Sequence, residues 1–155
     1  MSARHAGMSW WRSLLRHGGG NAAIELALLA TPLMLLAIGT ADYGLGVYQQ
    51  MEVQNAAQAG AEYARKHGFS ATGISSAITA ATPLAVTATP APAQSCGCPS
   101  GTAITPATCG TTCASGLAAG TYVTVGAQAI YTTLVPYPGI ANSYTLAASS
   151  TVRIQ

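Results

Sequence analysis

The distribution of apolar residues separates a long apolar segment near the N-terminus from a polar, almost uncharged C-terminal half. No charged residue occurs from Leu26 to Ala41, and the stretch from Ala22 to Ala41 has 20 residues. A helix of that length covers about 30 Å at about 1.5 Å per residue, enough to cross the hydrocarbon core of a bilayer. The pattern therefore predicts one membrane-spanning helix, which Pro32 is expected to bend.

The residues that follow predict that this helix continues outside the membrane. The stretch 47–68 is rich in Ala, Gln, Glu and Met and contains no proline, as expected of a helix. Small residues recur there at helical spacing and form one face: Val53, Ala57, Gly60, Ala61 and Ala64. This face suits packing against its own domain as well as packing against another subunit. Gly68 is the expected C-cap.

Residues 69–155 predict a small α+β domain. A short helix is expected over 70–82, where Ile74 and Ile78 share one side. Thr89 to Gly120 is rich in Pro, Gly, Ser and Thr and is predicted to be a loop. Strand-like alternation occurs in three stretches: 84–88, 121–135 and 144–154. The simplest architecture is an antiparallel sheet of about three strands packed on the exported half of the long helix.

Charge is scarce and unevenly distributed. Charged residues make up 6% of the chain, and beyond Lys66 the only one is Arg153. The formal net charge of +2 is too small to indicate a nucleic-acid partner. The first 20 residues contain three arginines and no acid. Because positive flanks stay in the cytoplasm, this predicts a cytoplasmic N-terminus and an exported C-terminal part.

The titratable residues do not form a pattern typical of an enzyme. All four acidic residues lie on or beside the predicted long helix: Glu25, Asp42, Glu52 and Glu62. Residues 68–152 contain no charged residue, and no histidine follows His67. A catalytic site needs titratable groups that converge in a pocket. We therefore expect no enzymatic activity and no cofactor.

Four cysteines lie within the predicted loop 89–120: Cys96, Cys98, Cys109 and Cys113. Their CxC and CxxxC spacings differ from the C-x2-C pairs usual in zinc sites, and disulfides form in exported segments. Two disulfides and no metal are expected. A Cys96–Cys98 bond would close a strained ring. Two pairings stay open: Cys96–Cys113 with Cys98–Cys109, or the crossed arrangement.

The apolar segment also has two plainer interpretations. Small residues at Gly39-Thr40-Ala41 suit a signal peptidase, so an ordinary signal peptide cleaved near Ala41 is one alternative. The protein would then be a secreted surface or binding protein. A plain single-pass anchor that never assembles is the other alternative. It leaves Gly20 and Glu25 unexplained. Glu25 needs an explanation because a carboxylate beside a membrane segment is costly.

The start of the chain resembles the class III signal of type IV pilins and pseudopilins. A short basic leader is followed by Gly20 and, five residues later, by Glu25 at the head of the apolar helix. The stretch 20–64 is similar to the N-terminal region of TadE-like proteins, pseudopilins of the tight-adherence (Flp, type IVb) pilus system. The proline in the apolar run and the "NAAQAGAEYA" stretch at 55–64 fit that pattern.

The resemblance implies a minor pseudopilin that takes part in pilus biogenesis and hence in surface adhesion. It implies cleavage after Gly20 by a prepilin peptidase, which would make Asn21 the new N-terminus. The implied domains are a cleaved leader, a membrane helix, its exported continuation and an exported α+β domain, at 1–20, 21–42, 43–68 and 69–155. The implied partners are the peptidase, other pilins reached through the N-terminal helix, the Tad secretion platform and the inner membrane.

Glu25 is expected to act in assembly. Cleavage would give Asn21 a protonated amino group, four residues from Glu25 and therefore on the same helix face. Glu25 is also expected in the first turn, where the helix dipole favours negative charge. In a bundle, Glu25 of one subunit could bind the amino group of a neighbour and set the axial register. The alternative is a glutamate that only reaches the lipid headgroups.

Overall fold

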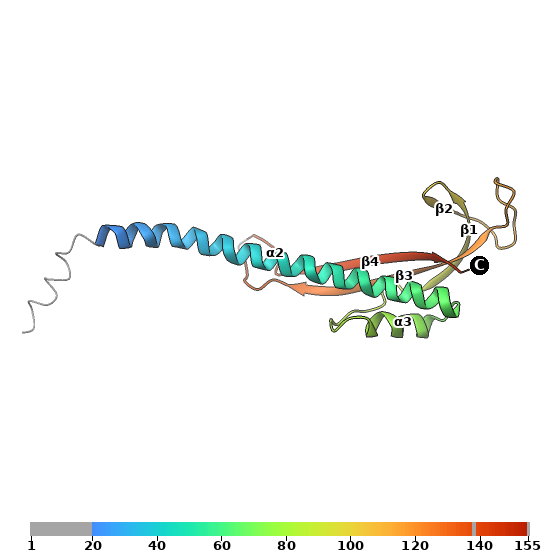
Figure 1. The fold of residues 1–155 in the computed structure, drawn as a ribbon, viewed down its shortest axis with the longest axis horizontal. Coiled ribbons are helices and arrows are strands. Elements are labelled where there is room, and N and C mark those ends of the chain that lie inside the picture. Colours follow the sequence, from blue (N-terminus) through green and yellow to red (C-terminus); the bar gives the residue numbers. More distant parts are fainter. Residues whose placement is uncertain (1–19, 138, 155) are drawn as a thin grey trace, which may run out of the picture. The chain divides into compact units, whose positions relative to one another are not determined.

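The computed structural model describes residues 20–137 and 139–154, so the predicted leader lies outside the described residues except for Gly20. The chain divides into two compact units that meet between Tyr43 and Gly44. The elements, in chain order, are α2 (Gly20–His67), α3 (Ala71–Ala80), β1 (Ala93–Ser100), β2 (Ala103–Pro106), β3 (Gly120–Thr132) and β4 (Ser143–Arg153) (Figure 1). The predicted α+β class, with a long N-terminal helix and a small antiparallel sheet, is confirmed.

Helix α2 continues through Pro32 as one element and ends where the sequence predicts. Its last turn carries Arg65, Lys66 and His67, which suit the negative end of the helix dipole. Gly68 has a φ of 80° and donates its N–H to the Ala64 carbonyl at 2.9 Å. Glycine adopts this left-handed conformation without strain, so it ends the helix as a C-cap.

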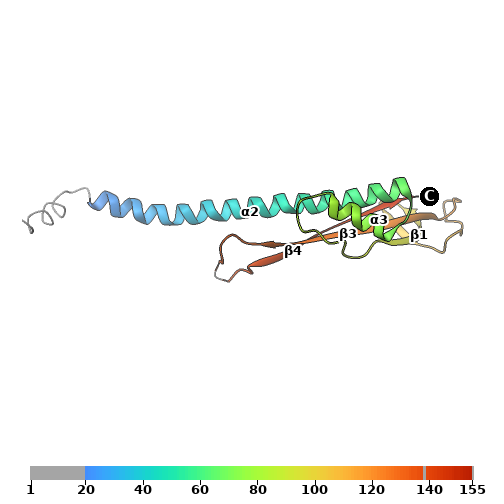
Figure 2. The same cartoon turned by 90° about the horizontal axis from the view of Figure 1, so that it is seen from below.

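The sheet has four antiparallel strands in the order β2-β1-β3-β4 (Figures 1 and 2). Strand β3 lies inside the sheet and pairs with β4 from Tyr122↔Arg153 to Thr132↔Ser143. It also pairs with β1 from Ala93↔Thr124 to Gly97↔Gly120. The predicted strands 121–135 and 144–154 are therefore confirmed, with boundaries shifted by a few residues.

Two expectations about the middle of the chain are wrong. The region 89–120, predicted as a loop, contains β1 and β2. The stretch 84–88 forms only an isolated bridge between Thr87 and Gln128 instead of a strand. β1 and Thr87 both pair with β3, which is distant in the sequence, and β2 pairs with β1. Local composition, rich in Gly, Pro and Ser, does not show such pairing.

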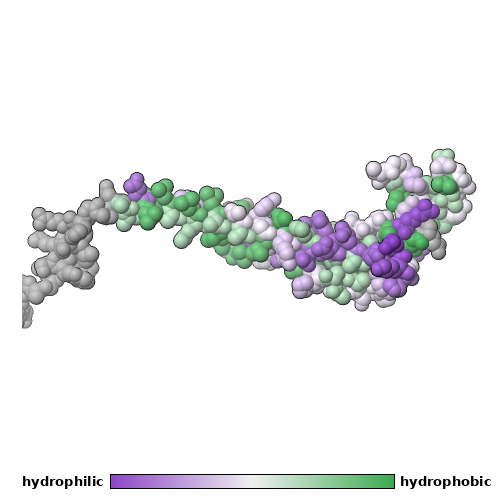
Figure 3. Space-filling model, in the orientation of Figure 1, coloured by the Kyte–Doolittle hydropathy of each residue, from purple (hydrophilic) through white to green (hydrophobic). Residues whose placement is uncertain are grey.

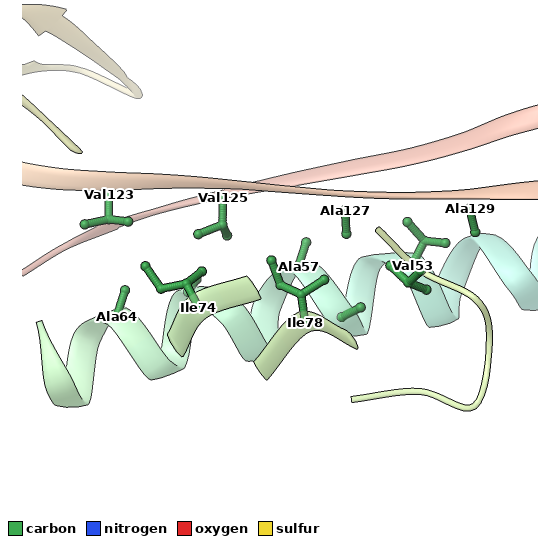
Figure 4. Packing of buried hydrophobic residues seen from close by; sticks show 12 residues of the cluster. Val53, Ala57, Ala64, Ile74, Ile78, Val123, Val125, Ala127 and Ala129 are labelled. Carbon is green, nitrogen blue, oxygen red and sulfur yellow. The ribbon is translucent and has the colours of Figure 1, made fainter. Parts of the chain in front are cut away.

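The core of the second unit lies between the sheet, the second half of α2 and the short helix α3 (Figure 4). Buried side chains of β3 face those of α2 and α3, with Val123, Val125, Ile74, Ile78 and Val53 all fully buried. The small-residue face of α2 predicted from the sequence is buried in this core, together with Ala56. The face therefore packs within its own domain, one of the two uses the sequence left open.

Candidate functional site

The described part of the first unit is a helical segment whose apolar side chains are uncovered. Eight of them are more than half exposed: Ile24, Leu26, Leu28, Leu29, Leu33, Met34, Leu35 and Leu36. Hydrophobic colour covers most of this part of α2 on the face shown in Figure 3. α2 is long and apolar enough to cross a membrane, and none of its most apolar window is buried. Such a helix requires lipid or other apolar helices around it.

The two threonines within this segment are satisfied by the helix itself. Thr31 donates its hydroxyl to the Ala27 carbonyl at 3.0 Å, and Thr40 donates to the Leu36 carbonyl at 2.7 Å. These bonds need no water, so both threonines are compatible with a hydrocarbon environment.

The residues of the predicted processing site lie at the start of α2. Gly20 is its first described residue, and Asn21 and Glu25 are four residues apart on the same helix, so they share one face. Glu25 is exposed. The first turn of α2 contains no acidic residue, so the prediction that Glu25 lies in the first turn is wrong. The reason is that the helix already begins at Gly20 and has completed a turn before Glu25.

The end of the apolar segment is marked by a buried acid between exposed apolar residues. Asp42 is only 5% exposed, although the next residue, Tyr43, is 77% exposed. From the sequence, Asp42 was only one of the four acidic residues on or beside the long helix, and its burial was not predicted. An aspartate is rarely buried so far unless it is paired, and Asp42 does take part in a polar interaction.

The four cysteines form two disulfides in the crossed arrangement. Cys96 pairs with Cys109 and Cys98 with Cys113, with Cα–Cα distances of 5.2 and 5.6 Å. The other pairing that the sequence left open is not the one found. Both bonds tie the segment after β2 back to strand β1. Across the described residues there is no group of three or more His, Cys, Asp or Glu that could hold a metal ion.

Glu62 lies near the end of α2 and forms the main charged cluster of the second unit. Arg65 donates to both carboxylate oxygens at 2.7 and 3.0 Å, and Lys66 lies 3.2 Å away. The hydrogen bonds from Arg65 and then Lys66 lower the pKa of Glu62 to about 2. All three groups are exposed, so the cluster supports the last turn of a helix and does not form a pocket.

Two shallow grooves lie on the second unit, and neither is lined by an ionisable side chain. The first, of about 260 Å³, lies between Gln54 and Gln58 of α2 and residues 147–150 of β4. The second, of about 320 Å³, lies beside Thr87, Gln128 and Thr145. Their lining of amides, hydroxyls and small apolar groups offers hydrogen bonds but no general acid or base.

The comparison with known proteins matches the segment that contains the predicted processing site. Residues 20–62 match the family model described as TadE-like protein. No curated protein and no solved structure matches the chain. The match starts at Gly20 and includes Glu25, the apolar segment and most of the rest of α2. The resemblance predicted from the sequence is thereby confirmed over residues 20–62, the segment that matches the TadE-like family model.

Proposed function

We propose that this protein is a minor pseudopilin that takes part in the assembly of a tight-adherence (type IVb) pilus and hence in surface attachment. One coincidence carries the proposal. The family match begins at Gly20, the predicted cleavage site, and Glu25 follows at the head of an uncovered apolar helix. A helix of this kind can be surrounded by lipid before assembly and by other pilin helices afterwards.

The proposed location is the inner membrane, with one membrane-spanning helix and a cytoplasmic N-terminus. The arginines of the first 20 residues support this orientation. The two disulfides support an exported second unit, because disulfides persist in oxidising compartments. The proposed role is structural, without catalysis or a cofactor.

Glu25 is the residue proposed to direct assembly. Its side chain is exposed on the face that also carries Asn21, so a neighbouring subunit can approach it. After cleavage the amino group of Asn21 in that neighbour would be the cationic partner. Burial of both groups among apolar helices would make their pairing strict, since an unpaired carboxylate in that environment is costly. The further proposed partners are the prepilin peptidase and the Tad secretion platform.

The rival is a surface protein released by signal peptidase near Ala41. One observation favours it: the two compact units meet between Tyr43 and Gly44, and the second unit has its own core. Cleavage near Ala41 would leave that unit almost complete.

The intact mass of the protein from its native host decides between these functions. The pseudopilin proposal predicts a chain that starts at Asn21, whereas the rival predicts a start at Asp42. A matched pair of variants tests the site. Gly20→Leu is expected to retain the leader, and the same substitution two residues earlier, Gly18→Leu, is expected to be processed. A mature chain starting at Asp42 would overturn the pseudopilin proposal.

A further inference from the structure

The turn that joins β3 to β4, residues 133–142, has an exposed apolar surface. Leu134 and Ile140 are 59% and 54% exposed, and Val135 is also exposed. Ile130 and Tyr144, on the strands next to the turn, are also exposed, on opposite faces of the sheet. No charged residue occurs within the turn, since none lies between Lys66 and Arg153. We call the described residues of this turn, 133–137 and 139–142, the hairpin turn.

The hairpin turn lies at the end of the second unit from which the chain leads to the apolar segment. From the start of β3 toward its end, the residues of α2 that the sheet contacts have progressively lower numbers. Ala147, which pairs with Gln128, accepts a hydrogen bond from Gln50, and Tyr131 lies 3.6 Å from a β-carbon built on Gly46. The turn follows directly after Tyr131. Gly46 is only five residues after Ala41, the last residue of the apolar segment.

Three hydrogen bonds are formed within the hairpin turn. Thr133 donates its N–H to the Asn142 carbonyl at 3.0 Å, and Ile140 donates to the Tyr137 carbonyl at 3.2 Å. The Thr133 hydroxyl also donates to Asn142 at 3.3 Å. Groups that already have hydrogen-bond partners lose little when they leave water.

Exposed tyrosines lie near the same end of the unit. Tyr48 of α2 and Tyr144 of β4 are both exposed. Tyrosine is enriched where membrane meets water, because its ring is apolar and its hydroxyl is polar. Exposed apolar side chains, tyrosines, internal hydrogen bonds and the lack of charged residues within the turn together fit a lipid headgroup region.

We propose that the hairpin turn rests in the headgroup region of the membrane on the exported side, as a second contact with the bilayer beside the spanning helix. The partner is the lipid surface itself. The inference rests on the proposed membrane anchor, but not on cleavage or on pilus assembly. A second contact would fix the orientation of the exported unit on the membrane before assembly.

Fluorophores at three positions test the proposal in the full chain. Since all four native cysteines are in disulfides, one added cysteine can be labelled alone with an environment-sensitive dye. The variants are Ile140→Cys in the hairpin turn, Leu33→Cys in the apolar segment and Thr102→Cys. Thr102 lies in the turn between β1 and β2, beyond the other end of β3. The length of β3, which separates the hairpin turn from that other end, is about 40 Å at about 3.3 Å per residue.

The protein is reconstituted in vesicles of phosphatidylethanolamine and phosphatidylglycerol, with or without lipids that carry a nitroxide near the headgroup. We expect quenching and a shift to shorter wavelength at positions 33 and 140, and neither at position 102. Quenching at 33 with position 140 behaving like 102 would overturn the inference and leave the anchor standing. No quenching at 33 would overturn the anchor and the inference with it. Shielding of 140 that rises with the protein-to-lipid ratio, without lipid quenching, would assign the surface to a second copy and overturn the inference.

Two leucines provide a matched test of the surface. Leu134 lies in the hairpin turn, whereas Leu117, which is 63% exposed, lies in the segment between Cys113 and β3. Leu134→Asp is expected to reduce quenching of the dye at position 140, and Leu117→Asp is expected to leave it unchanged. Amide-exchange protection of β3 confirms in each case that the sheet is intact. Equal quenching in the two variants would contradict the proposed contact.

Discussion

Gly60 of α2 lies so close to Ile78 of α3 that a β-carbon at position 60 would stand 2.6 Å from Ile78 Cγ1. The same atom would stand 3.3 Å from Ile74 Cγ2. A real β-carbon does not tolerate the shorter of these distances, so the two helices can approach only because position 60 has no side chain. Glycine within a helix costs about 1 kcal/mol relative to alanine, and the contact with α3 outweighs that cost.

Gly60→Ala should therefore destabilise the second unit although alanine favours helices. Overpacking costs about 1–3 kcal/mol, so we expect a net loss of up to about 2 kcal/mol after the gain in helix propensity. Amide hydrogen exchange of β3 in the full chain measures this loss. Gly44→Ala is the matched control, because nothing lies within 4 Å of its β-carbon. An equal response of both variants would show that Ile78 does not restrict position 60.

Double variants in which two cysteines are replaced by serine test the crossed arrangement. In a matched variant the two cysteines form one disulfide, and in a mismatched variant they come from different disulfides. The matched variant Cys96→Ser/Cys109→Ser should keep one bond and show no reactive thiol when denatured without reductant. The mismatched variant Cys96→Ser/Cys113→Ser should expose two thiols, those of Cys98 and Cys109. Loss of the Cys96–Cys109 bond in the matched variant should also destabilise the second unit by about 3 kcal/mol, as expected for a closed loop of roughly 15 residues. The opposite labelling pattern would assign the other pairing.

Glu25→Gln separates insertion from assembly. The variant keeps Gly20 and the apolar helix, so membrane insertion and cleavage should be normal. Loss of the charge should abolish pilus assembly or co-purification with partner pilins, because the neighbour's amino group would lose its partner. Glu62→Gln serves as the control, since Glu62 is paired within its own chain. Wild-type piliation by the Glu25 variant would leave this residue without a role in assembly.

Acid should destabilise the end of α2, because it protonates Glu62. Its pKa is about 2 in the folded protein, below the ordinary value of 4.5. A lowered pKa means that the carboxylate stabilises the fold above the ordinary value, and that this contribution is lost as pH falls from about 4.5 to about 2. Exchange protection of the last turn of α2 should decrease across this window. In Glu62→Gln the decrease should be absent, and an unchanged decrease would assign it to another group.

The elements with strong local signals could be predicted from the sequence. The apolar run, the small-residue face and the alternation around Val123 and Val125 each depend on nearby residues, and each corresponds to an observed element. Strand β1 could not be predicted, because its pairing with β3 is long-range, and β2 pairs only with β1. Gly97, a residue that weakens strands, is needed there: a β-carbon at position 97 would stand 2.9 Å from the Thr105 carbonyl oxygen of β2.

The candidate site was predictable to a similar extent. The spacing of Gly20 and Glu25 is a property of the sequence itself, and the family match covers both residues. The disulfide pairing was not predictable, because both open arrangements close loops of similar length. The burial of Asp42 could not be predicted either, since an acid after an apolar run is normally expected to face water.

The lack of charge between Lys66 and Arg153 has a consequence for resistance to proteolysis. Proteases of the trypsin type cut after lysine or arginine, and residues 67–152 offer them no such bond. Both disulfides, helix α3 and all but the last residue of the sheet lie in that stretch. Resistance to these enzymes is therefore a property of the composition, and it persists even when the second unit opens or unfolds.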